Sequence, residues 1–124
     1  MANAKNKLLT AFKSALDYLG ITSAYKRYAG DKYPYLTYEY FITNVSREDG
    51  STDGELICEI WTRGTFAELD DIDAKLEDYF KQRNIQVDND VIHFDYATST
   101  PEDDEDGELK KLQVSITTKY WKGA

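Results

Sequence analysis

The sequence predicts an α+β domain in which a mostly antiparallel sheet of four strands carries two helices on one face. Residues 35–45 and 109–121 alternate apolar and polar side chains, as strands with one buried face do. Residues 6–19 and 65–80 repeat apolar side chains at helical spacing. With two further strand-like runs, the expected order is helix, strand, strand, helix, strand, strand.

The first helix is expected over residues 6–19 and is followed by Gly20, a residue that commonly ends helices. Residues 21–33 are ambiguous, because tyrosines are interleaved with lysine and arginine there. Such a pattern can stack on single-stranded nucleic acid. Alternatively, the tyrosines cover one end of the core and keep their hydroxyls in water. The acidic composition of the chain favours the second interpretation.

The centre of the predicted fold is a strand over residues 55–63 that leads into a helix over residues 65–80. Thr65 and Glu68 have the spacing of a capping box, in which a hydroxyl and a carboxylate each meet a free backbone N–H. Acidic residues occupy the first turns of this helix, where the helix dipole favours them. Basic residues are expected in its last turn, namely Lys81 and Arg83.

Turns and loops join these elements. Residues 46–54 are dense in turn formers, so the strands on either side are expected to form an antiparallel hairpin with a mobile tip. Residues 84–90 are expected to be a polar connection, in which Ile85 and Val87 allow a short extended piece. The remaining elements are a strand (91–97), an acidic loop (98–108) and a long strand (109–121).

The overall composition indicates one domain, residues 1–124, that is long enough to bury a core. No apolar run approaches membrane-spanning length, and we expect no signal peptide. The single cysteine, Cys58, permits no internal disulfide, which fits a reducing cytoplasm. The formal charge of −8 argues against a general nucleic-acid binder, because phosphate affinity comes from Lys and Arg.

The charge is distributed unevenly along the chain. Residues 1–28 carry five basic and one acidic residue, whereas residues 29–124 carry ten basic and twenty-two acidic ones. Either the basic end of one copy attracts the acidic body of the next, or the charges belong to an ordinary solvated surface. The candidate contact residues at the basic end are Lys5, Lys7 and Lys13.

The acidic loop has some features of a calcium site. An EF-hand loop that began at Glu102 would need a bidentate acid at its twelfth position, where the chain has Gln113. A second near-match over residues 49–54 places Ile60 at that position. We therefore expect neither a metal site nor a cofactor, and treat the loop as solvated or as a contact for a basic partner. Its candidate contact residues are Glu102, Asp103, Asp104, Glu105 and Asp106.

Catalytic signatures are few. His93 and Asp95 lie two residues apart on one strand face and are the only basis for a hydrolase-like hypothesis. A lone strand histidine is more often structural. Cys58 lies on the more apolar face of its strand, which predicts an inert buried thiol. The sequence lacks a glycine-rich phosphate loop and the CxxC, HExxH and GxSxG motifs, so we expect no enzymatic activity.

Several short stretches follow one another in a fixed order beyond residue 32. They are Tyr-Pro-Tyr, Glu-Asp-Gly, Trp-Thr-Arg-Gly-Thr, and Gly-Glu-Leu-Lys-Lys-Leu-Gln-Val leading into Lys-Tyr-Trp-Lys. In this order they resemble a family of small tail-completion proteins, minor structural proteins from tailed phages and prophages of Gram-positive bacteria. The family is similar in outline to the siphophage tail terminators. The stretches occupy residues 33–35, 48–50, 61–65, 107–114 and 119–122.

The resemblance implies a structural virion protein without catalytic residues. Such proteins form a ring, often a hexamer, that completes the tail tube and joins it to the head connector. DNA then passes through the ring without specific binding, and no membrane is involved. The implied location is the tail end or neck of the virion, after assembly in the host cytoplasm. A second hypothesis is a small intracellular protein-binding module that uses the tyrosine-rich hairpin or the acidic loop.

Overall fold

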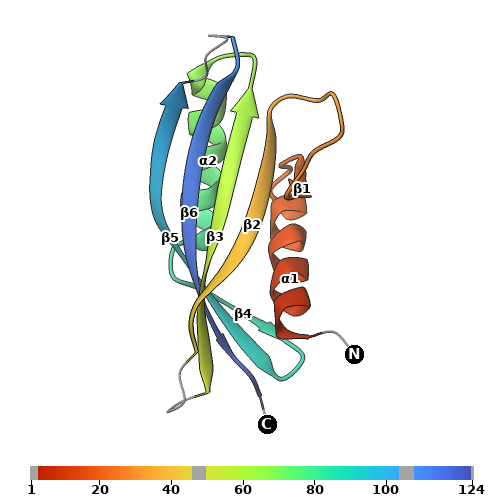
Figure 1. Cartoon of the computed structure of the whole chain (residues 1–124), viewed down its shortest axis with the longest axis vertical. Coiled ribbons are helices and arrows are strands. Elements are labelled where there is room, and N and C mark those ends of the chain that lie inside the picture. Colours follow the sequence, from red (N-terminus) through yellow and green to blue (C-terminus); the bar gives the residue numbers. More distant parts are fainter. Residues whose placement is uncertain (1–2, 46–49, 104–107, 124) are drawn as a thin grey trace.

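The computed structural model describes residues 3–45, 50–103 and 108–123, without the side chain of Asp103 (Figure 1). These residues form two helices and one six-stranded sheet. No helix among them is both long and apolar enough to cross a membrane. The helices are α1 (Ala4–Tyr18) and α2 (Phe66–Phe80), and the strands are β1 (Ser23–Tyr25), β2 (Tyr35–Val45), β3 (Ser51–Thr62), β4 (Arg83–Val87), β5 (Asp90–Asp103) and β6 (Lys110–Trp121).

The sheet is mixed, and its strand order is β1-β2-β3-β6-β5-β4. β1 runs parallel to β2, whereas every other neighbouring pair is antiparallel. The expected four-stranded antiparallel sheet is therefore wrong. The order along the chain is α-β-β-β-α-β-β-β. The prediction omitted the two edge strands, β1 and β4, because their segments are too short to show a clear strand pattern.

Two of the predicted strands are longer than expected. β3 begins at Ser51 and β5 continues to Asp103, so the predicted loops 46–54 and 98–108 are both too long. The cause is the long central strand β6, whose backbone pairs with β3 on one side and with β5 on the other throughout its length. A shift in register between Tyr96 and Thr98 lets β5 continue past a bulge.

Both helices pack on the same face of the sheet, where they bury one hydrophobic core (Figure 1). α1 contacts β1 and β4, the two edge strands, so the sheet curves around it. Phe12 of α1 lies at the centre of this core. Its ring centroid is 5.1 Å from those of Tyr38 and Phe80 and 6.2 Å from that of Phe94. The core therefore joins α1, β2, α2 and β5.

The start of α2 differs from the predicted capping box. Thr65 is the N-cap, but its side chain makes no capping hydrogen bond. The Glu68 carboxylate instead accepts a hydrogen bond of 2.6 Å from the Thr62 hydroxyl, whose oxygen accepts the Gly64 N–H at 3.0 Å. The last turn of α2 holds no basic residue. Of the two basic residues predicted there, Lys81 lies just beyond the helix and Arg83 lies in β4.

A buried carboxylate, Asp90, joins the start of β5 to α1 and to the end of β6. Asp90 is 6% exposed. It accepts hydrogen bonds from the Tyr120 hydroxyl, from the Gly123 N–H at 2.8 Å and from the Lys7 ammonium at 3.2 Å. These donors lower the pKa of Asp90 to about 2.

This lowered pKa makes stability depend on pH. The ordinary pKa of the carboxyl is 3.8, so folding favours the charged form. The stabilisation is complete above about pH 5 and is lost as the pH falls through the folded-state pKa near 2. We expect Asp90→Asn to melt below the wild type at neutral pH, and the gap to narrow between pH 4 and pH 2. Thermal melts of both proteins at several pH values measure this, and a gap independent of pH would contradict it.

Candidate assembly surface

The outer end of the β2–β3 hairpin exposes apolar side chains. Phe41, Ile42 and Val45 of β2 are 49%, 57% and 62% exposed. They make up half of the six large apolar side chains that the described residues leave exposed. We call residues 41–45 of β2 together with residues 51–54 of β3 the hairpin end. Phe41 lies on the opposite sheet face from Ile42 and Val45, so the hairpin end is apolar on both faces. Exposed apolar side chains gathered at one end of a hairpin favour an interaction site there.

The backbone of the hairpin end is also incompletely paired. β1 pairs with β2 only from Leu36 to Tyr38. Among the described residues no strand pairs with the same edge of β2 beyond Tyr38. Backbone groups of alternate residues point to the same side of a strand, so those of Tyr40 and Ile42 point outward along this edge. Such an edge is prone to contact another chain.

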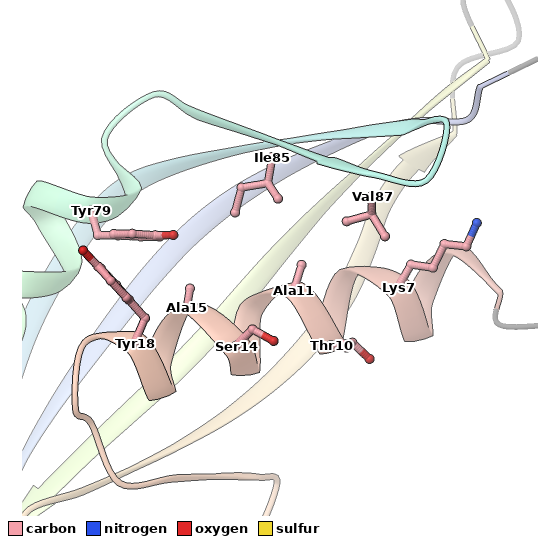
Figure 2. A pocket seen from close by; sticks show the side chains of 9 residues that line it. All are labelled: Lys7, Thr10, Ala11, Ser14, Ala15, Tyr18, Tyr79, Ile85 and Val87. Carbon is pink, nitrogen blue, oxygen red and sulfur yellow. The ribbon is translucent and has the colours of Figure 1, made fainter.

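A groove lies between α1 and β4 (Figure 2). Its volume is about 520 Å³. Ile85 and Val87 of β4 point toward α1, and Ala11 points back at them. The ring centroids of Tyr18 and Tyr79 are 5.9 Å apart at one end, and Lys7 lies at the other. We call this the α1–β4 groove, which is lined by Lys7, Thr10, Ala11, Ser14, Ala15, Tyr18, Tyr79, Ile85 and Val87.

The groove exists because the wall that α1 contributes is built largely from small residues. Thr10, Ala11, Ser14 and Ala15 are too short to fill the space beneath β4. The buried large residues of α1, which point into the core instead, are Leu8, Phe12 and Leu16. The helix therefore approaches β4 without closing the gap, and an apolar concave surface stays open beside the sheet edge.

The hairpin end and the α1–β4 groove lie toward opposite edges of the sheet. β2 is second from one edge and β4 forms the other edge. Every copy of the chain therefore presents one projecting apolar feature and one concave apolar feature in different places. A contact between the two would be heterologous, and heterologous contacts build rings or open filaments.

The predicted basic contact residues all lie on α1. Lys5 is exposed. Lys13 donates to the backbone oxygen and the hydroxyl of Ser23, at 2.9 Å each, and forms an ion pair of 3.3 Å with Asp17. Lys7 is bound to Asp90 and lies 3.4 Å from Asp88. Lys7 and Lys13 therefore also serve the fold, and Lys7 additionally lines the α1–β4 groove.

The predicted acidic contact residues are only partly within the described chain. Glu102 lies in β5, and its carboxylate is 2.9 Å from the Lys111 ammonium. Lys111 also contacts Glu59 at 3.2 Å and lies over the Trp61 ring at 4.7 Å. Asp103 ends β5. The other three lie outside the described residues: Asp104, Glu105 and Asp106.

The two residues of the hydrolase-like hypothesis, His93 and Asp95, each contact a different neighbour and not one another. His93 and Asp95 lie on the same sheet face, opposite Ile92 and Phe94. However, His93 Nδ1 is 2.6 Å from the side-chain oxygen of Asn84, and Asp95 accepts the Gln82 N–H at 3.1 Å. The imidazole and the carboxylate are therefore each bound to a different partner. Within residues 3–45, 50–103 and 108–123, no group of three or more His, Cys, Asp or Glu could hold a metal ion.

Cys58 is fully buried in β3, as predicted. Desolvation raises the pKa of its thiol well above the ordinary value, so the reactive thiolate is disfavoured. This thiol is therefore available neither as a nucleophile nor for cross-linking in the folded chain.

The ambiguous segment 21–33 divides between the two sheet faces. Tyr25 of β1 packs against Tyr38 at the margin of the core, with ring centroids 5.6 Å apart. Tyr28 instead stacks on Tyr35 at 4.5 Å, on the sheet face that the helices leave uncovered. Tyr35 in turn stacks on Trp61 at 6.3 Å. These rings support one another as a row across the uncovered face.

Two surfaces thus stand out by geometry, the hairpin end and the α1–β4 groove. The sequence offered the tyrosine-rich hairpin as a binding surface, but not its exposed apolar end, because the open edge of β2 depends on how short β1 is. It did not indicate the groove, which depends on where α1 meets β4. The small residues on one side of α1 were the only sequence signal. A scan of the chain against models of known protein families matched none, and a search among curated proteins found no match.

Proposed function

We propose that this chain is a structural protein that assembles head to tail with copies of itself into a closed ring. In this proposal the ring completes the tail of a phage or prophage and joins it to the head. The phage assignment rests on the resemblance of the sequence to tail-completion proteins. The observation that carries the assembly role is the hairpin end, whose three exposed apolar side chains lie on an incompletely paired strand edge.

Physical chemistry supports association at this surface. Burying apolar surface contributes roughly 25 cal/mol for each Å² removed from water. An unpaired strand edge adds backbone hydrogen bonds when a partner covers it. The uneven charge of the chain supports contacts between unlike parts of neighbouring copies, because residues 1–28 are basic and the rest is acidic.

Electron microscopy of lysates from a phage that lacks this gene tests the function. We expect overlong or ragged tails, or finished heads beside unattached tails, because the tail end would be incomplete. A plasmid-borne copy of the gene should restore normal particles. Normal infectious particles in its absence would contradict the proposal and would favour the protein-binding module instead.

A further inference from the structure

We infer that the hairpin end of one copy docks in the α1–β4 groove of the next copy. This inference rests on the proposed function, and it specifies which two surfaces form the contact between copies. Ile42 is the residue placed to enter the groove. It pairs with Gly54 on the sheet face that carries Tyr40 and Leu56, and it extends that apolar face beyond the core.

The two surfaces match in their chemistry. The groove has an apolar floor formed by Ile85 and Val87 from β4 and Ala11 from α1 (Figure 2). The volume of the groove is about 520 Å³. One water occupies roughly 30 Å³ in the liquid, so the groove is many times larger and can hold a whole aliphatic side chain. Ile42 is aliphatic and 57% exposed in the single copy.

Charge favours a second copy as the occupant. Residues 39–55, which contain the hairpin end, carry five carboxylates and one arginine. The two walls of the groove, residues 4–18 and 83–90, carry four basic and three acidic residues. The hairpin is thus strongly acidic and the walls are slightly basic, so approach of a hairpin to a groove is attractive. Approach of one hairpin to another is repulsive, which disfavours symmetric hairpin-to-hairpin dimers.

The positions of the surfaces favour propagation. A hairpin that occupies a neighbour's groove leaves its own groove free for the next copy, because the two features lie toward different edges of the sheet. Repetition of this contact leads to a closed ring when the rotation between copies closes.

Disulfide trapping between differently tagged chains tests the contact. One chain carries Ile42→Cys and the other carries Ala11→Cys. Cys58 stays in both, because it is fully buried. We expect the mixed disulfide in about tenfold excess over a control mixture, the excess that a contact worth ~1.4 kcal/mol produces. In the control, Asp70→Cys on the exposed side of α2 replaces Ile42→Cys.

Equal yields from both mixtures would overturn the inference. A predominance of Ile42→Cys homodimers would show hairpin-to-hairpin contact and would overturn it as well. If a small apolar ligand or a lysate protein abolishes the excess at a concentration below that of the chain, that competitor binds the groove more tightly than a second copy does, and the inference is overturned.

Complementation separates this inference from the proposed function. In a phage that lacks the gene, we expect Ile42→Asp to fail to restore normal tails, because a carboxylate would enter an apolar groove. Phe66→Asp is the matched control, since Phe66 is an exposed aromatic on α2 outside both surfaces. If Ile42→Asp restores normal tails, the inference fails and the function stands. If loss of the gene itself leaves tails normal, the function fails.

Discussion

Replacing Phe12 with alanine is expected to lower the free energy of unfolding by about 3–5 kcal/mol, the range for large aromatic-to-alanine changes in cores. Phe12 is completely buried, and its ring contacts rings from β2, α2 and β5. The variant loses both the transfer of the ring out of water and the contacts across the resulting cavity. Urea titration of the variant and the wild type at low protein concentration measures the difference.

Two further variants make this result interpretable. Phe12→Leu keeps most of the apolar volume and should cost less than half as much. Phe66→Ala removes a phenyl ring that is 41% exposed and should change stability by only about 0.5 kcal/mol, as surface substitutions do. A cost below about 1 kcal/mol for Phe12→Ala would show that α1 is not fixed to the sheet as described.

Periodic patterns predicted the long elements well, because burial imposes them directly. β6 buries every second residue along most of its length, and the sequence shows that alternation. β2 has the predicted bounds, Tyr35–Val45. Gly20, with φ of +75°, follows the end of α1 as expected, because glycine adopts this conformation without strain.

The missed features depend on partners distant in sequence. β1 has only three residues, and its identity as a strand comes from pairing with β2 rather than from its own pattern. The acidic end of β5 resembles a loop in composition, yet pairing with β6 keeps it extended to Asp103. The Glu68 carboxylate was expected to cap α2, but the hydroxyl of Thr62 lies within reach and binds it instead. Tertiary contacts overrode the local signal in all three places.

The candidate surfaces were missed for the same reason. The lysines of α1 were predicted to contact a partner from their charge alone, and the structure binds two of them, Lys7 and Lys13, within the chain. The α1–β4 groove lies between two elements that are distant in the sequence, because β4 begins 65 residues after α1 ends. Only the fold reveals that Thr10 and Ser14 border an open space, while Ala15 beside them is buried in the core.

In the proposed assembly, one contact repeated around a ring joins every copy to the next. A chain that carries both Ile42→Cys and Ala11→Cys tests this claim most directly. Head-to-tail joining should link many copies through oxidation, because each copy offers one cysteine in its hairpin end and one in its groove. The hexameric rings implied by the resemblance would give a largest species of six copies.

The measurement is the mass distribution of the oxidised double variant under denaturing, non-reducing conditions, with alkylation of any remaining thiols. We expect a ladder that ends at one dominant closed species, in which neither introduced cysteine is alkylated while Cys58 is. A dominant dimer with both introduced cysteines protected would show a reciprocal pair of copies and would contradict the ring.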